Sequence, residues 1–184
     1  MNKTSIRKNI ILLYIHYLLV ILWLALMFVI FWFSSQPADV STEQSLTIGK
    51  FICKIVVSGY GEMTGITQRQ YAELYDHFVR KSAHFCEYAV LGALTYNVAY
   101  LVFNYLKTRK KKDLRSIYLI ISSLLWCILY ASTDEIHQLF VEGRYGSSLD
   151  VILDAAGSLL GIMLVVLIRY LISKKYSPSP SEDI

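Results

Sequence analysis

The chain has 184 residues, of which 55% are hydrophobic, and its mean hydropathy is +0.45. This apolar share is well above that of an ordinary soluble domain, so the composition excludes a water-soluble globular protein. The net charge of +4 comes from basic residues at the ends of apolar runs, which argues against a nucleic-acid partner and indicates that these residues orient the chain in a lipid bilayer.

Four apolar stretches are long enough to cross a bilayer. A hydrocarbon core about 30 Å thick requires roughly 20 apolar residues in a helix. The first stretch is too long for the apolar part of a signal peptide and no small-residue cleavage site follows it, so we expect a retained helix. The predicted spans are residues 10–33, 82–106, 116–133 and 151–172. The sequence therefore predicts an all-α polytopic membrane protein with four transmembrane helices, forming a single domain over residues 1–184.

The basic residues predict the orientation of these spans. Lys and Arg collect on the cytoplasmic side of membrane proteins. With the amino terminus inside, 12 of the 18 Lys and Arg residues lie inside, including those of the loop 107–115. We therefore expect both termini in the cytoplasm and the loop 34–80 outside. The Ser- and Pro-rich tail, residues 176–184, is predicted to be disordered.

The outer loop, residues 34–80, is predicted to contain two short amphipathic helices. Ser41-x-x-Gln44 and Thr67-x-x-Gln70 both match a capping box, a pattern that opens many helices. After each box, apolar residues recur at helical spacing: Ile48, Phe51, Ile52 and Ile55 after the first, and Tyr71, Leu74, Tyr75 and Phe78 after the second. Stripes of this kind pack on the bundle or lie in the headgroup region.

Ionisable residues in or near membrane spans are costly, so each of them is a candidate for function. At 1.5 Å per residue, counting from the basic anchors places Glu87, Asp134 and Asp154 at a similar depth, near the outer edge of the hydrocarbon. Helical spacing adds further polar residues to the same faces. The candidate catalytic residues are His84, Glu87, Asp134, Glu135 and His137. The candidate substrate-binding residues are Lys81, Gln138, Arg144, Asp150 and Asp154.

Two further patterns surround this predicted site. Gly157 and Gly161 form a small-xxx-small surface on the fourth span, which lets a neighbouring helix approach closely. Ser34, Ser35 and Gln36 end the first span at the same outer level. These three residues either cap the first helix or hydrogen-bond to the site.

Three interpretations of the polar cluster are open from the residues alone. In the first, the side chains form only ion pairs and helix caps at the membrane interface. In the second, His84, Glu87, Asp134 and His137 bind a divalent metal, the one cofactor that the residues suggest. In the third, the pocket binds a lipid-linked phosphate or sugar, or performs acid–base chemistry on one. The residues assign no specific reaction.

The order and spacing of these motifs resemble the VanZ-like family of bacterial membrane proteins. The matching segments are FSSQ at residues 33–36, RKSAHFCEYAVLG at 80–92 and DEIHQLFVEGRYGSSLDVILDAAGSLLG at 134–161. The family pattern falls on Gly157, Gly161 and all but one of the candidate site residues. At Asp154 many relatives carry an asparagine, which argues against a charge requirement there.

The resemblance implies a role at the bacterial cell envelope, in the cytoplasmic membrane. It implies reduced susceptibility to glycopeptide antibiotics of the teicoplanin type, with a lipid-linked cell-wall precursor or the glycopeptide as a partner beside the lipid bilayer. Many similar chains occur without a resistance cluster, so a housekeeping envelope role is an alternative. The resemblance is also compatible with a membrane-embedded enzyme that acts on a lipid-linked precursor, with or without a metal, and with a non-catalytic membrane adaptor.

Overall fold

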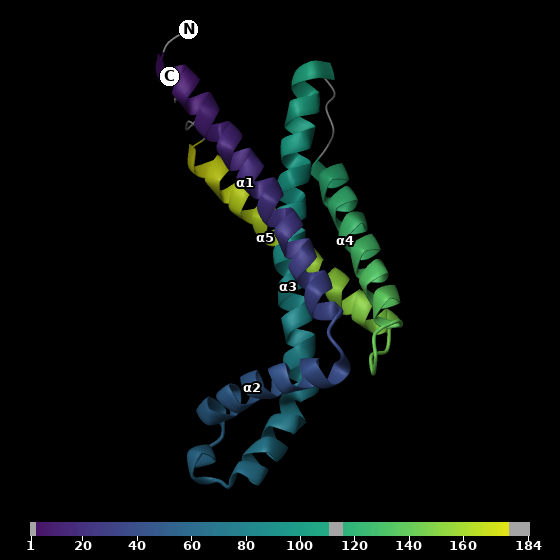
Figure 1. Ribbon diagram of the computed structural model, residues 1–184. Helices are drawn as coiled ribbons and strands as arrows, with labels where there is room; N and C mark the ends of the chain where they lie inside the picture. Colours follow the sequence, from purple (N-terminus) through teal and green to yellow (C-terminus); the bar gives the residue numbers. More distant parts are fainter. Residues whose placement is uncertain (1–2, 111–115, 177–184) are drawn as a thin grey trace.

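The computed structural model describes residues 3–110 and 116–176, and these residues form helices joined by short turns, with no strand among them. The elements are α1 (Lys3–Ser34), α2 (Ala38–Val56), the 3-10 helix η1 (Tyr60–Glu62), α3 (Gly65–Lys110), α4 (Ser116–Gln138) and α5 (Ser148–Tyr176). In Figure 1, α1, α3, α4 and α5 form a bundle, and α2 lies at the end where α1 and α4 finish and α5 begins. We call this the α2 end.

Four helices are long and apolar enough to cross a membrane. Their candidate spans are Ile10–Ser34, Gly65–Tyr105, Ser116–Gln138 and Ser148–Lys175. The predicted all-α fold with four spans is therefore confirmed. The third and fourth spans, in α4 and α5, extend beyond the predicted limits. The predicted limits stopped at the first polar residues, but polar residues do not interrupt a helix. Within the basic loop and the tail, residues 111–115 and 177–184 lie outside the described residues, so the predicted disorder of the tail is not tested.

The structure corrects the prediction of two separate helices in the first long loop. Only α2 is separate, because the second predicted helix is continuous with the second span in the 46-residue helix α3. No Gly or Pro interrupts the chain between Gly65 and Gly92, so nothing breaks the helix there.

Both capping boxes also misplace the start of a helix. Helix α2 begins at Ala38, directly after Pro37 and ahead of Ser41. Helix α3 begins at Gly65, and the hydroxyl of Thr64 accepts a hydrogen bond from the Thr67 backbone N–H at 3.4 Å. A proline or a threonine three or four positions before each predicted cap opens the helix instead.

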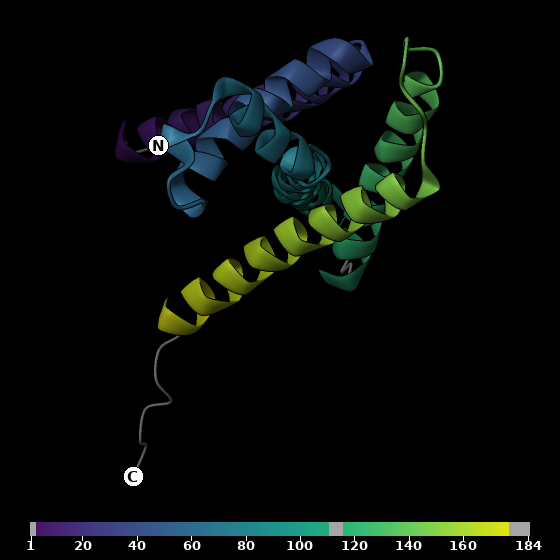
Figure 2. The same cartoon turned by 90° about the horizontal axis from the view of Figure 1, so that it is seen from below.

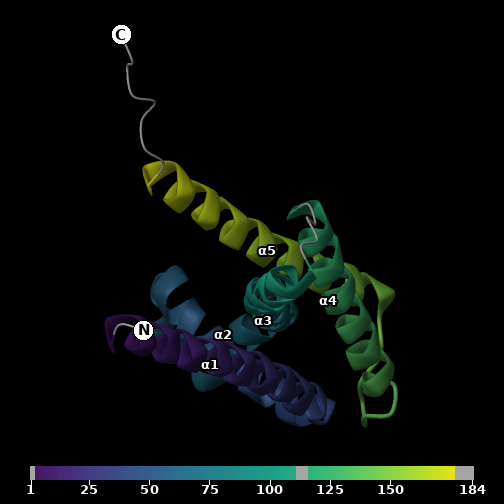
Figure 3. The same ribbon diagram turned by 90° about the horizontal axis from the view of Figure 1, so that it is seen from above.

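Helix α3 is the centre of the bundle and contacts α1, α2, α4 and α5. Figures 2 and 3 show it nearly end-on, with the other three spanning helices around it. The closest approach is between α3 and α5. A Cβ atom added at Gly157 would collide with the backbone carbonyl of Phe85, and one at Gly161 with that of Ala89. These two glycines therefore let α5 lie directly against α3.

Buried apolar side chains form two small clusters between the spanning helices. One cluster is Ile30, Tyr88, Leu91, Cys127 and Ala131, and the other is Tyr96, Leu119 and Ile162. Many larger apolar side chains point outward, as on α1, where Phe28 is 65% exposed. Such a surface is unfavourable in water and suits the hydrocarbon of a bilayer. The chain is a multi-pass membrane protein.

Candidate functional site

A pocket of about 570 Å³ lies at the α2 end of the bundle. Its walls come from α2, α3, α4, the loop between α4 and α5, and the start of α5. Seven of the predicted catalytic and binding residues line it: Lys81, His84, Glu87, Glu135, Gln138, Arg144 and Asp150. The helical faces predicted from the sequence therefore meet in one cavity, because three helices and a loop converge at this end.

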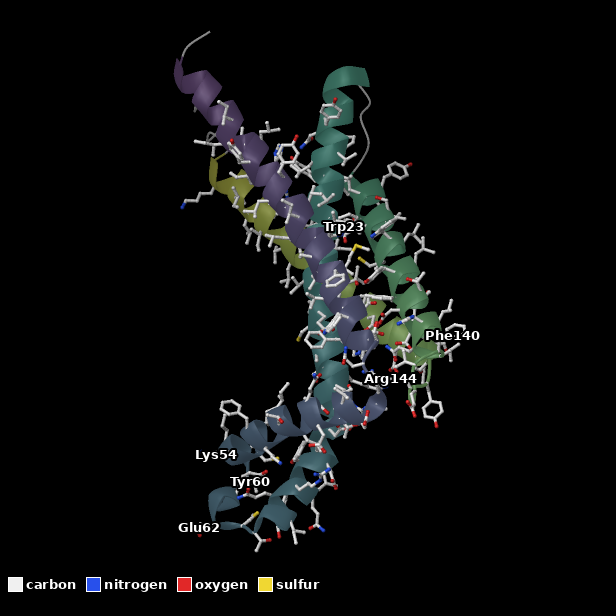
Figure 4. The ribbon with its side chains drawn as sticks, in the orientation of Figure 1. Trp23, Lys54, Tyr60, Glu62, Phe140 and Arg144 are labelled. Atoms are coloured by element: carbon white, nitrogen blue, oxygen red, sulfur yellow. The ribbon has the colours of Figure 1, made fainter. Side chains whose placement is uncertain are left out.

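Arg144 joins the loop between α4 and α5 to the end of α1. Its Nε donates a hydrogen bond to the Gln36 carbonyl at 3.1 Å, and its Nη2 donates to the Phe33 carbonyl at 3.3 Å. Figure 4 labels this side chain where α1 ends, beside α4. Burial and the nearby Arg80 lower the pKa of Arg144, while Asp134 and Glu135 act in the opposite direction. The guanidinium stays charged in every case, because arginine is not deprotonated in proteins.

The other two cations at the pocket have carboxylate partners. Lys81 Nζ lies 2.7 Å from Asp150 Oδ1, an ion pair that joins α3 to α5. Arg80 Nη2 lies 2.7 Å from Asp76 Oδ2, one turn earlier on α3. Within residues 3–110 and 116–176, Arg144 forms no such pair. In this part of the chain its hydrogen bonds go to neutral carbonyl groups, so its charge is available to a ligand.

Glu135 has a structural role that the sequence did not assign. Its Oε2 accepts a hydrogen bond from the Ser147 backbone N–H at 2.7 Å, just before α5 begins. A carboxylate at this place satisfies a free N–H group and favours the start of the helix. Glu135 therefore fixes the loop that carries Arg144. At this one position, the side chain acts as a helix cap, as the first of the three interpretations expects.

Two carboxylates lie behind the pocket, between α3, α4 and α5. Asp134 is 2% exposed and Asp154 is fully buried. In the described part of the chain, neither oxygen of Asp154 has a hydrogen-bond partner, and neither has the hydroxyl of Tyr88, which interacts electrostatically with both carboxylates. The side chains of Ser34 and Gln138 lie beside the Asp134 carboxylate and interact with it. Buried polar groups without partners are costly and are rare in folded proteins. This buried group, Tyr88 with Asp134 and Asp154, is therefore a second polar layer below the pocket.

His137 does not line the pocket. Its ring stacks on Phe31 of α1 with 4.5 Å between the ring centroids, and its Nε2 lies 3.2 Å from Ser35 Oγ. The predicted metal ligand set of His84, Glu87, Asp134 and His137 is therefore not assembled. The described segments contain no group of three or more His, Cys, Asp or Glu side chains placed to hold a metal ion.

One protein family matches most of the chain, including the pocket. The family is VanZ/LLP1, and its match covers residues 17–169, which include every candidate site residue. The chain belongs to the VanZ-like family. No curated protein and no solved structure matches the chain. The family assignment thus covers most of the bundle and the whole pocket without naming a ligand or a reaction.

The residues that end α1 serve both of the roles that the sequence left open. In this VanZ-like chain, Ser35 Oγ donates to the Phe31 carbonyl at 2.6 Å and Gln36 Nε2 donates to the Trp32 carbonyl at 3.2 Å, so both residues cap the helix. The Gln36 carbonyl also accepts the bond from Arg144, so the same turn positions the pocket.

Sequence reasoning missed one wall of the pocket. Ser41, Thr42 and Ser45 of α2 line the cavity, opposite the acidic residues of α3 and α4. Their spacing places them on one side of a helix, and this pattern in the sequence could have identified the wall. The capping-box interpretation of Ser41 hid it, because that interpretation placed the residue at a helix end.

The pocket of this VanZ-like chain offers donors and acceptors to a ligand. The guanidinium of Arg144 and the amide of Gln138 line the cavity and can donate to an oxyanion. Glu87 lines the same cavity one turn beyond His84 and can accept from a hydroxyl or ammonium group. The set suits a ligand that carries an anionic group and several hydrogen-bond donors.

Proposed function

We propose that the pocket binds the phosphate-bearing headgroup of a lipid-linked cell-envelope component, and that this binding reduces susceptibility to teicoplanin-type glycopeptide antibiotics. The observation that carries the proposal is Arg144, a partly buried cation without a carboxylate partner in the described chain, which lines a pocket of about 570 Å³. A guanidinium offers paired N–H groups that match phosphate oxygens. A cavity of this size is in the usual range for small-molecule sites, about 300–1,000 Å³.

The proposal places the α2 end on the outer side of the bacterial cytoplasmic membrane. Helix α5 carries Lys174 and Lys175 in its last turn, at the opposite end from the pocket. Helix α3 ends at that same opposite end, and its last residues include Lys107, Arg109 and Lys110. Since cytoplasmic ends are the basic ones, both termini are assigned to the cytoplasm and the pocket to the outside. Lipid-linked cell-wall precursors are presented at that outer surface.

A second candidate function is an enzyme that acts on the same lipid-linked component. Its support is the pair of His84 and Glu87, one helical turn apart in the pocket. His84 Nδ1 is buried without a hydrogen-bond partner in residues 3–110 and 116–176, so it is open to exchange a proton with a bound ligand. This second function predicts a chemically altered precursor, whereas binding alone leaves the precursor unchanged.

Teicoplanin susceptibility in a sensitive bacterial host tests the proposal. We expect the wild-type chain to raise the inhibitory concentration, and Arg144→Ala and Glu87→Gln to lose this effect. Arg144→Lys is expected to lose most of it, because an ammonium group cannot contact two carbonyls and a phosphate in the same way. Glu62→Gln is the matched control for Glu87→Gln, since Glu62 is exposed on η1 and does not line the pocket.

All variants are compared at equal amounts in the membrane. Full protection by Arg144→Ala and Glu87→Gln would show that the pocket is not needed for this function. Absence of protection by the wild-type chain would remove the resistance role, and extracted precursor lipids would then be tested directly for binding to the wild-type and Arg144→Ala proteins.

A further inference from the structure

The helical hairpin formed by α2, η1 and the first part of α3 has one strongly apolar side. Phe51 and Ile55 of α2 are 66% and 71% exposed, and Leu74 and Phe78 of α3 are 77% and 68% exposed. Within each helix these residues are three or four positions apart and share a face. We call Ile48, Phe51, Ile55, Leu74 and Phe78 the apolar side of the hairpin.

An apolar groove joins the two stripes of this side. A cavity of about 480 Å³ lies between α2 and α3 and is lined by Ile52, Cys53, Val56, Tyr75, Phe78 and Val79. Phe78 belongs to both the groove and the apolar side. The two helices therefore present one continuous apolar surface rather than two separate stripes, and a surface of this kind usually marks an interaction site.

The opposite side of the hairpin is charged. Arg69 of α3 bridges two carboxylates there, Glu43 of α2 at 2.9 Å and Glu73 of α3 at 3.0 Å. All three side chains are about half exposed or more. The hairpin is thus amphipathic as a unit, with ion pairs on one side and large apolar side chains on the other.

The hairpin lies beyond the hydrocarbon part of the bundle but next to it. The candidate span of α3 has 41 residues, which is about 60 Å of helix and twice the thickness of the hydrocarbon core. Helix α2 begins at Ala38, only four residues after α1 ends at Ser34. Figure 1 shows α2 running across the direction of the membrane-spanning part of α3, rather than continuing away along it. Helix α2 therefore starts at the membrane surface and runs along it.

We propose that the apolar stripe of α2, formed by Ile48, Phe51 and Ile55, is seated in the headgroup region of the same bilayer that the bundle spans. Two observations favour lipid over a protein partner. Helix α2 follows closely on the end of α1, where Phe28 and Trp32 are 65% and 58% exposed and face lipid. The charged opposite side leaves the hairpin its own water-facing surface, as in helices that lie in the interface plane.

Site-specific fluorescence in nanodiscs tests this placement. The full chain carries Cys86→Ala, which removes the exposed thiol, while Cys53 and Cys127 are fully buried. Single cysteines at Phe51 or Ile55 are labelled with a nitrobenzoxadiazole probe in nanodiscs of phosphatidylcholine and phosphatidylglycerol. Phe28→Cys serves as the lipid-facing reference, and Glu43→Cys as the matched control on the charged side of α2. Loss of an exposed ion pair at Glu43 costs little stability.

The expected result is a blue-shifted emission and a loss of fluorescence with doxyl-labelled lipid for the probes at Phe51 and Ile55, as for Phe28→Cys, with neither change at Glu43→Cys. Emission from Phe51 and Ile55 that matches Glu43→Cys would overturn the proposal, because the apolar side would then face water. A blue shift without quenching by doxyl lipid would also overturn it, because the surface would then be covered by a second copy or another protein. Two independent positions on the apolar side guard against one variant that fails to fold.

Discussion

Asp154 is a fully buried carboxyl group without hydrogen-bond partners in the described chain. Glu87, Asp134, Glu135 and Asp150 all interact with it electrostatically, and every one of them is acidic. A buried carboxyl group among other carboxyl groups is unfavourable, so its charge does not stabilise the fold.

We predict that Asp154→Asn keeps the fold and raises the melting temperature in detergent, because an amide has the same shape and carries no charge. Tryptophan fluorescence on heating measures this, since the chain contains Trp23, Trp32 and Trp126. Asp150→Asn is the matched control, because it breaks the partly exposed ion pair with Lys81 and is expected to change stability by less than about 1 kcal/mol. A lower melting temperature for Asp154→Asn would show instead that the carboxyl group itself stabilises the fold.

Sequence patterns identified most of the pocket at this scale but not the direction of every side chain. The spacing of Lys81, His84 and Glu87 on one helix is enough to place them on one side, and all three line the cavity. His137 was grouped with Asp134 by the same rule, yet it stacks on Phe31 instead. Spacing fixes the face of one helix, whereas the position of the neighbouring helix decides what that face meets, and α1 is distant in sequence.

At the scale of the elements, the contact between α3 and α5 depends on residues without side chains. A Cβ at Gly161 would fall on the Ala89 carbonyl oxygen, which belongs to the backbone of α3 and cannot rotate away. Helix propensity favours alanine over glycine by about 1 kcal/mol. Forcing an extra carbon into a packed contact costs about 1–3 kcal/mol. The cost of the collision exceeds the gain in helix propensity here, because a backbone atom cannot rotate out of the way.

Gly161→Ala is therefore predicted to lower the melting temperature of the purified protein in detergent. Gly65→Ala is the matched control, because the same substitution at the start of α3 meets nothing within 4 Å. The control is expected to leave the melting temperature unchanged or slightly higher. Equal stability of the two variants would mean that α5 moves away from α3 at little cost.

The sequence predicted the number of spanning helices because each span must supply its own apolar length. It did not predict the 46-residue helix α3, because a capping-box pattern can also occur inside a helix. The boxes at Ser41 and Thr67 both lie inside helices that begin a few residues earlier. The apolar stripe of residues 71–78 predicted a helix correctly. Whether that helix stops before the second span depends on a breaker, and between Gly65 and Gly92 the chain has neither Gly nor Pro.

At the scale of the whole molecule, the pocket and the proposed membrane surface share helix α2. Ile48 belongs to the apolar side of the hairpin and also lines the pocket. Seating α2 in the headgroup region would therefore place one wall of the pocket at the level of lipid phosphates. A ligand with a lipid anchor could then present its headgroup to Arg144 while its tail stays in the bilayer.

The sidedness of the bundle decides which leaflet supplies that ligand, and it can be measured with two serine positions. Ser58 lies in the exposed turn after α2, and Ser173 lies near the opposite end of α5. In the Cys86→Ala chain, Ser58→Cys is predicted to react with a membrane-impermeant maleimide in intact cells. Ser173→Cys is predicted to react only after the membrane is permeabilised, because the basic residues beside it favour the cytoplasm. The reverse pattern would place the pocket inside the cell, where an extracellular glycopeptide does not reach it.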